Sequence, residues 1–277
     1  MTEPGAERAR VYRTEAIVLH QQDYGEADRI LRLLTPQGRL DVIAKGVRRA
    51  TSRKAGHIGL FARVQLMLAR GRSLDVVTQA EAMETYVALG RDLRRFSHAC
   101  YVGELAAAFS QHQEECRSLY GLLADTLARL CETADLELWT RRFEVRLLGV
   151  SGFWLELYRC VVCGAEIQPR RNAWSADEGG IICPHCAADQ PGLGTLSLAA
   201  QKVLRFMARR PDSDIVRLRL SDATSSEVRA LLRAYLRQVL ERDLNSVGFM
   251  DRLELELRQI ESGASARDGQ PERLSPR

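Results

Sequence analysis

Two pairs of cysteines are the side chains of this 277-residue chain best suited to chemistry. Cys160 and Cys163 form one CxxC pair, and Cys183 and Cys186 form a second pair after 19 intervening residues. This spacing is close to a known zinc pattern of two CxxC pairs, whereas a thioredoxin-type redox site needs only one such pair. Four thiolates fill the tetrahedral shell of zinc and leave no position for water or substrate, so we expect one structural zinc ion.

The residues around the two pairs also favour a metal site. Gly164 suits a tight turn at the first pair, and Gly179 and Gly180 predict a hairpin turn before the second pair. His185 lies inside the second pair, but four sulfurs suffice, so we expect it to be a bystander. Four reduced thiols without metal are the alternative, which is disfavoured because exposed free thiols are a liability. Three further cysteines lie among apolar residues and are predicted to be buried and inert: Cys100, Cys116 and Cys131.

A closed zinc shell holds a fold and runs no reaction, so the charge distribution is the next guide to function. Residues 1–80 carry 14 Lys and Arg against 8 Asp and Glu, although the net charge of the chain is only +4. Residues 39–72 alone hold nine bases and one acid, Asp41. Such a local excess predicts contact with phosphate groups. The predicted contact residues are Arg39, Lys45, Arg48, Arg49, Arg53, Lys54, Arg70 and Arg72.

The basic region reads as short strands separated by turns. Its runs are rich in β-branched and apolar residues, several with alternation of period two. Five short strands in about 80 residues predict a five-stranded OB-fold barrel, with an SH3-like barrel as the nearest competitor. The expected strands are 15–20, 28–35, 39–47, 62–70 and 73–81.

From about residue 82 the apolar spacing becomes helical. Apolar residues recur at intervals of three and four over residues 93–111, 116–132, 136–150 and 198–210. A further helix carries a stripe from Val228 to Leu240, and Thr224 with Glu227 predicts a capping box at its start.

The fold class is therefore α+β, an OB-fold barrel followed by a helical bundle with an inserted four-cysteine zinc module. The predicted domains are 1–81 (basic barrel), 82–156 (first helical part), 157–190 (zinc module), 191–261 (second helical part) and 262–277 (disordered tail).

Composition and absent motifs restrict the function classes. The chain is 45% hydrophobic and 27% charged, which is ordinary for a globular protein. No stretch approaches the length of a membrane helix and the first ten residues lack an apolar signal core, so we expect a cytoplasmic protein. No phosphate-binding loop, dinucleotide fingerprint, HExxH helix or GxSxG elbow occurs, so we expect a non-enzymatic protein. A basic OB-type barrel favours sequence-independent, salt-sensitive binding of nucleic acid.

Two stretches of the basic region resemble a known family. "DYGEADRILRLLT" (23–35) and "GRLDVIAKGVRRATSR" (38–53) are similar to the N-terminal region of the bacterial RecO recombination mediators, and the resemblance continues to about residue 250. The motifs Tyr24–Asp28 and Ala44–Arg49 are specific when they occur together. Some members of this family lack the cysteines, which agrees with a structural role for zinc.

The resemblance implies a fold and a set of partners. Proteins of this family have an N-terminal OB-fold and a helical domain that carries the zinc module. They bind single- and double-stranded DNA and anneal complementary strands. They also engage RecR and the acidic C-terminal tail of single-stranded-DNA-binding protein (SSB), and thereby help RecA load on coated DNA in DNA repair.

A second basic feature suggests where the tail binds. Arg229, Arg233 and Arg237 recur every four residues beside the apolar stripe of the last predicted helix. An acidic, amphipathic peptide fits a groove with such a border, so we predict the partner site there. Two alternatives remain open. One is a sequence-specific zinc module, for which the zinc segment offers only Arg170 and Arg171, and the other is an enzyme with its site in the helical domain.

Overall fold

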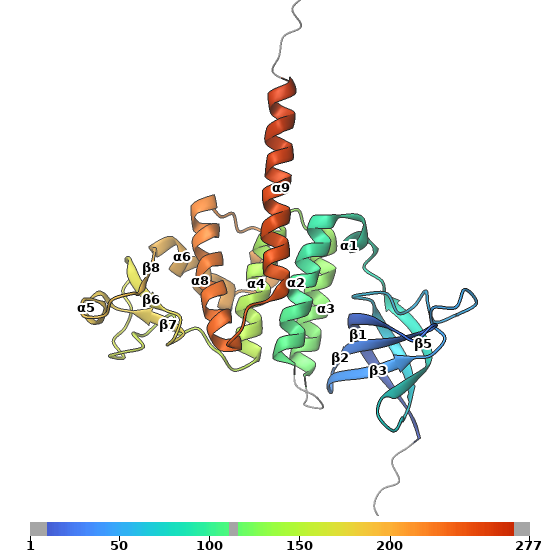
Figure 1. The fold of residues 1–277 in the computed structure, drawn as a ribbon. Helices are drawn as coiled ribbons and strands as arrows, with labels where there is room; N and C mark the ends of the chain where they lie inside the picture. Colours follow the sequence, from blue (N-terminus) through green and yellow to red (C-terminus); the bar gives the residue numbers. More distant parts are fainter. Residues whose placement is uncertain (1–9, 111–115, 269–277) are drawn as a thin grey trace, which may run out of the picture.

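The N-terminal strands close into a barrel, and the computed structural model describes residues 10–110 and 116–268 of the chain. The strand order is β1-β2-β3-β5-β4, and β4 pairs with β1 to complete the ring (Figure 1). The pairs are antiparallel except β3 with β5, which are parallel. This order confirms the predicted five-stranded OB-type barrel. The strands are β1 (Val11–Tyr24), β2 (Asp28–Thr35), β3 (Gly38–Ala44), β4 (Arg63–Ala69) and β5 (Asp75–Glu84).

Strand β1 is buried on both faces and thereby fastens the barrel to the helices. Ala16 and Val18 point into the barrel core, whereas Ile17 and Leu19 join the hydrophobic core of the helical body. Successive strand side chains face opposite sides, so one strand serves two cores. β1 is longer than the predicted segment 15–20 because its outer half continues to pair with β4 from Val11 onward.

Phe61 is the main aromatic contact between barrel and helices. It lies in the loop before β4 with a positive φ of 63°, and its ring meets Phe96 edge-on at 6.0 Å between centroids. A Cβ atom at Gly103 would lie 2.8 Å from the Phe61 ring, so only glycine permits this approach. The two parts therefore pack closely at this point.

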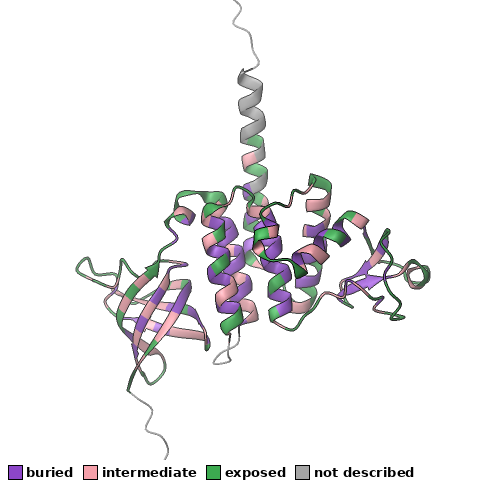
Figure 2. Ribbon diagram, turned by 180° about the vertical axis from the view of Figure 1, so that it is seen from behind, coloured by how far each residue is buried: buried purple, intermediate pink, exposed green. Residues whose placement is uncertain are grey.

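Helices form the middle of the molecule, and the buried residues concentrate on their facing sides (Figure 2). α2, α3 and α4 pack against one another, and α6, α8 and α9 complete the body. The helices predicted over 93–111, 116–132, 136–150, 198–210 and 228–240 are confirmed in the described residues, and residue 111 lies outside them. The helices of the body are α1 (Val87–Arg91), α2 (Leu93–Phe109), α3 (Arg117–Glu132), α4 (Leu136–Val150), α6 (Leu198–Arg209), α7 (Asp212–Ile215), α8 (Asp222–Leu240) and α9 (Asn245–Asp268).

The helical body contains buried charge. Arg141 and Glu144 of α4 are fully buried and form an ion pair at 2.8 Å, and the hydroxyl of Tyr101 donates to the same carboxylate at 2.5 Å. Burial raises the pKa of Glu144 to about 7, although Arg141 and Tyr101 act in the opposite direction. The neighbouring Arg142 donates to the backbone carbonyls of Met207 and Arg210 and to Asp212. Arginines of α4 thus serve as internal ties between helices.

The start of α8 differs from the predicted capping box. Ser221 is the N-cap, and its hydroxyl accepts from the backbone N–H of Thr224. Glu227 instead reaches α6, where its two oxygens accept from the N–H and the hydroxyl of Ser197, each at 2.6 Å. Ser197 is itself the N-cap of α6. The tertiary contact with α6 therefore decides the partner of Glu227, which the local sequence placed in a capping box with Thr224.

Helix α9 corrects the predicted boundary of the tail. It begins where Glu104 of α2 accepts from the N–H groups of Asn245 and Ser246, and it continues to Asp268. It therefore runs past residue 262, where the tail was expected to begin. Extension of an existing helix needs no new nucleus, which explains why weakly patterned residues continue it. Residues 269–277 of that predicted tail lie outside the described residues.

A small sheet carries the cysteine pairs at the far side of the body from the barrel (Figure 1). Its order is β7-β6-β8, with α5 (Pro184–Ala187) after β7. The ring of Trp174 meets Tyr235 of α8 edge-on at 6.3 Å, which seats the sheet on the helices. Gly179 has a φ of 63° and supplies the predicted hairpin turn. The strands are β6 (Asn172–Ser175), β7 (Gly180–Ile182) and β8 (Gly194–Leu196).

Candidate functional site

The four paired cysteines form one cluster. The sulfurs of Cys160, Cys163, Cys183 and Cys186 all lie within 4.8 Å of one another, and those of Cys163 and Cys183 are 3.9 Å apart. Four sulfurs about 2.3 Å from a tetrahedral zinc would be separated by about 3.8 Å, so the arrangement fits that ion. The positions of the four sulfurs in the fold, as well as their spacing in the sequence, are thus compatible with a zinc ion.

Backbone amides favour the thiolate form of Cys160, whereas hydrogen bonds with the neighbouring thiols raise the pKa of Cys186. Burial by itself would raise the pKa of the Cys160 thiol, but N–H groups of Cys183 and Cys163 directed at its sulfur lower the pKa to about 6. The N–H of Cys183 lies 3.4 Å from that sulfur. The side chain of His185 is exposed and does not belong to the cluster, as expected. Metal coordination requires deprotonated sulfur, which these amides favour.

The remaining cysteines are less buried than predicted. Cys100, Cys116 and Cys131 are half-buried rather than fully buried, because their helices α2 and α3 pack only one side against the core. Burial raises the pKa of Cys100 to about 11 and raises that of Cys131. Raised thiol pKa values keep the sulfur protonated, which agrees with the predicted lack of reactivity.

The predicted phosphate-binding residues divide between the two ends of the barrel. Strand β3 runs from Gly38 to Ala44, so Arg39 lies at one end and Lys45 at the other. The six residue steps from Arg39 to Lys45, at about 3.3 Å each, separate these ends by about 20 Å. The loop from Lys45 to Lys54 belongs to the end with the β1–β2 turn, whereas Arg70 and Arg72 follow β4 at the end with Arg39.

Exposed bases gather on the loop that follows β3, which we call the basic loop (45–54). Lys45, Arg49 and Arg53 are exposed, and within residues 10–110 and 116–268 none of them makes an ion pair. Gly46 shapes the start of the loop with a φ of 64°, and its N–H donates to Asp28 at 2.7 Å. The loop therefore presents uncompensated positive charge to solvent.

Two other bases of the basic loop hold its shape. Arg48 contacts Asp23 at 3.3 Å and donates to the carbonyl of Gly25. The ammonium of Lys54 donates to the carbonyls of Lys45 and Val77, at 3.1 and 2.9 Å. These contacts tie the loop to the β1–β2 turn and to β5, so the predicted set contains supporting residues as well as exposed ones.

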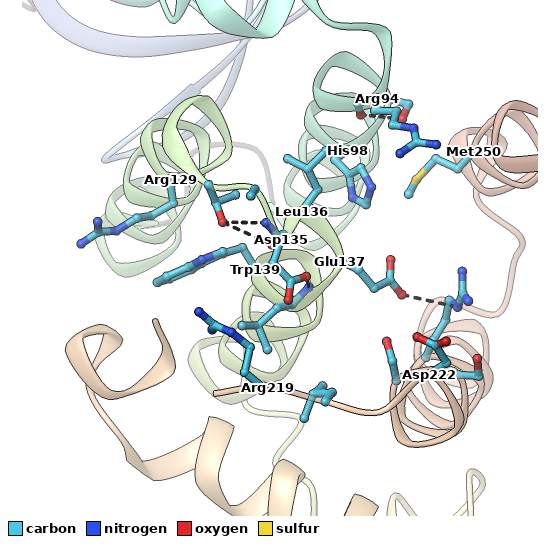
Figure 3. Close-up of a pocket in the computed structure, with 18 of the residues that line it drawn as sticks. Arg94, His98, Arg129, Asp135, Leu136, Glu137, Trp139, Arg219, Asp222 and Met250 are labelled. Atoms are coloured by element: carbon cyan, nitrogen blue, oxygen red, sulfur yellow. Dashed lines mark hydrogen bonds and ion pairs between the residues drawn. The ribbon is translucent and has the colours of Figure 1, made fainter. Parts of the chain in front are cut away.

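A second candidate site is a pocket of about 1,100 Å³ in the helical body (Figure 3). Its lining comes from α2, the end of α3, the first turns of α4 and α8, the segment before α8 and one side of α9. Leu136, Met250 and Leu253 contribute apolar surface, and Arg129 lies over the ring of Trp139 at 5.4 Å. The arginines of the lining are Arg94, Arg129, Arg219 and Arg229. They come from four separate elements, so no local sequence pattern could have brought them together.

Only one arginine of the predicted α8 stripe lines this pocket. Arg229 contacts Glu137 at 3.4 Å at the pocket wall. Arg233 pairs with Asp251 of α9 at 2.9 Å, so it faces the neighbouring helix. Arg237 pairs with Asp243 at 2.7 Å and is largely exposed. The three residues share one side of α8 but meet three different surroundings.

Comparison with known proteins identifies the family. Residues 10–86 match the family described as Recombination protein O N terminal, and residues 90–247 match Recombination protein O C terminal.

Within the described residues no helix is long and apolar enough to cross a membrane.

Curated relatives agree over most of the chain. A protein of Roseiflexus sp. named DNA repair protein RecO is 43% identical over 88% of this chain and 86% of its own length. Proteins of the same name from Dehalococcoides mccartyi and Pelotomaculum thermopropionicum are 37% and 36% identical, over 87% and 94% of this chain and 96% and 99% of their own lengths. The chain, with its five-stranded barrel, helical body and cysteine module, belongs to the RecO family of DNA repair proteins.

Proposed function

We propose that this protein is a non-enzymatic DNA-binding and strand-annealing mediator of recombinational repair. The observation that carries the proposal is the exposed, unpaired charge of the basic loop on an OB-type barrel. Lys and Arg side chains neutralise backbone phosphates and release counterions, which gives affinity without sequence preference. A surface that shields the phosphates of two strands also reduces the repulsion that opposes their annealing.

The partners belong to the same proposal. We infer that the protein works with RecR in the cytoplasm to help RecA load on DNA coated by SSB. We place the acidic SSB tail in the pocket of the helical body, because its lining combines apolar surface with four arginines. The lining also holds four acids, and Glu137 pairs with Arg229, so the tail would have to compete with that carboxylate. Substituting Arg229 with alanine should weaken binding of a fluorescent tail peptide about tenfold, which corresponds to one lost charge-assisted contact. The matched variant Arg237→Ala should bind normally, and equal binding by both variants would remove the tail from this pocket.

Zinc takes a structural part in the proposal. The four sulfurs would hold one ion with a closed shell, and the ion would supply folding free energy to the small sheet. Because the cysteine module lies across the helical body from the barrel, zinc supports the fold without touching the basic loop (Figure 1).

The decisive experiment compares two triple variants across a salt series. Substituting Lys45, Arg49 and Arg53 with alanine should weaken DNA binding about tenfold or more and reduce the slope of log Kd against log salt by about 2 for single strands. The control replaces three exposed bases outside the barrel, Arg170, Arg171 and Lys202, and should leave both quantities unchanged.

Annealing of complementary oligonucleotides, followed by fluorescence quenching, should fail with the basic-loop variant at protein concentrations where the control is active. If the control loses affinity instead, the zinc module carries DNA contact and the alternative of a sequence-specific zinc module gains ground. If neither variant loses affinity, DNA contact by the basic loop is excluded.

A further inference from the structure

The second basic end of the barrel forms a groove with the helical body. The β2–β3 hairpin, the first residues of β1 and the turn after β4 face the start of α3 across a space of about 870 Å³. Figure 1 shows this hairpin beside the lower end of α3. The N–H of Cys116 donates to the carbonyl of Pro36 at 2.9 Å, which fixes the helix start against the hairpin. We call this space the junction groove.

Four arginines from four separate segments line the junction groove. Arg13 is exposed, and Arg39 and Arg70 come from the ends of β3 and β4. Arg117 comes from the first turn of α3, where the backbone N–H groups add positive potential. None of this grouping is visible in sequence, since Arg13 and Arg117 are 104 positions apart. The groove therefore joins the barrel and the helical body into one basic surface.

The two acids of the lining are already engaged. Glu15 pairs with Arg63 at 3.1 Å and accepts from Tyr120 at 3.2 Å. Asp75 accepts from the hydroxyl of Tyr12 at 2.5 Å and from the N–H of Gly71 at 3.0 Å. In the described lining, four arginines therefore outnumber two acids that already have partners within the protein.

Two details of the lining point to a nucleic-acid strand. The guanidinium of Arg70 lies over the ring of Tyr12, 4.8 Å from its centroid, and a guanidinium plane held in this way can stack on a base. The Nε atom of Arg39 is buried and has no hydrogen-bond partner among the described residues, although Nη1 donates weakly to Ala107 at 3.4 Å. The guanidinium of Arg39 therefore has donor capacity left for an acceptor such as a phosphate oxygen.

The size of the groove favours an unpaired strand. Its volume lies within the range of sites that enclose small ligands, so the sugar-phosphate backbone of one strand can enter. A duplex is too wide to enter and could touch only the rim. The basic loop contributes no residue to the lining of this groove or of the pocket in the helical body.

We propose that the junction groove binds a single nucleic-acid strand, with Arg13, Arg39 and Arg117 contacting phosphates and Arg70 stacking on a base. The proposal rests on the proposed DNA-binding function and adds a site specific for unpaired DNA, to which the helical body contributes. The barrel then has two basic surfaces about 20 Å apart. The basic loop accepts any phosphate backbone, whereas the groove selects single strands.

Affinity for two matched probes tests the proposal in the full-length protein. The double variant Arg13→Ala with Arg117→Ala should weaken binding of a fluorescent oligothymidine at least fivefold and lower its salt slope by about 1.4, the value for two lost phosphate contacts. Binding of a blunt hairpin duplex should change less than twofold. The control Lys202→Ala with Arg242→Ala, two exposed bases of the helical body, should bind both probes normally.

A second variant adds positive charge to the groove and should raise its affinity for a single strand, a result that a misfolded protein would not give. Gln37 is exposed on the hairpin and lines the groove, so Gln37→Arg should tighten oligothymidine binding at least twofold. Unchanged single-strand affinity in both groove variants, or equal loss for the two probes, would overturn the proposal. If the basic-loop variant still weakens both probes, only the groove is rejected. If it does not, the proposed function fails as well.

Discussion

The barrel and the helical body use arginine in opposite ways. The interior of the barrel is an apolar cluster that includes Val18, Leu33 and Leu66, and its bases lie outside. The helical body buries Arg141 and Arg142 and uses them to join its helices. Strand alternation sends every second side chain outward, whereas a helix packed by several neighbours has few directions left for a long side chain. The number of arginines in a segment of sequence therefore does not give the number that a binding partner can contact.

Removing the metal ligands should have the largest effect on stability. It should also separate the structural role of the cysteine module from the DNA-binding role of the barrel. Replacing all four cysteines of the cluster with serine should abolish zinc binding and unfold the small sheet, since zinc contributes roughly 10 kcal/mol in small metal-coupled folds. Metal analysis and thermal unfolding with and without chelator measure this loss, while DNA affinity of the barrel should be retained. An unchanged Tm would show that the cysteines do not support the fold.

The next largest effect is expected from the buried charge of the helical body, which we infer stabilises the fold. Glu144→Ala leaves Arg141 buried without its closest partner and should cost about 3–5 kcal/mol of unfolding free energy. Urea denaturation measures it. The control Glu132→Ala removes a largely exposed carboxylate of α3 and should stay within about 0.5 kcal/mol. Equal effects from both substitutions would contradict the contrast between buried and exposed charge.

Acidity should change stability through the same buried carboxylate. Burial raises the pKa of Glu144 from 4.5 to about 7, so the folded state holds its proton at a pH where the unfolded state has released it. The contribution of Glu144 is therefore fully present below pH 4.5 and is lost as pH rises to about 7, by an amount on the order of 3 kcal/mol. Unfolding free energies of the wild type and of Glu144→Gln across this range measure it, and the variant should lack this component.

A smaller effect is expected from the tie between α8 and α9. Arg233→Ala removes the pair with Asp251, which is partly exposed, and should cost about 1 kcal/mol. A double-mutant cycle with Asp251→Ala isolates the pair, and DNA affinity should not change. A loss of DNA affinity without a loss of stability would show that Arg233 contacts DNA, as proposed for the bases of the barrel. The contrast between the barrel and the helical body would then be weaker.

The smallest effect should come from the supporting lysine of the basic loop. Lys54→Ala removes hydrogen bonds to two backbone carbonyls and should cost about 0.5 kcal/mol of stability. Its effect on the salt slope should be smaller than that of Arg53→Ala, which is about 0.7 for one phosphate contact with a single strand. If the two slopes changed equally, Lys54 would contact phosphate despite its internal bonds.

Much of the fold followed from local patterns. Alternation within β4 and the apolar spacing of α2 to α4 predicted these elements close to their observed limits. Element ends were less predictable: Ser221 caps α8 while Glu227 bonds to Ser197, a partner 30 positions earlier. Such choices depend on which helix ends meet in space.

What the sequence determined by itself is the cysteine cluster and the identity of the barrel. The cluster depends on short-range order, since two CxxC turns and one hairpin bring the sulfurs within 4.8 Å, and the barrel was predicted from the strand patterns of one continuous segment. Only the tertiary structure decided which bases face solvent, which are internal ties, and which share the junction groove. Strand β3 places Arg39 and Lys45 at its opposite ends, although they are close in sequence, and the docking of α3 on the barrel brings Arg13 and Arg117 into one groove, although they are far apart in sequence. Strand direction and helix docking set these distances.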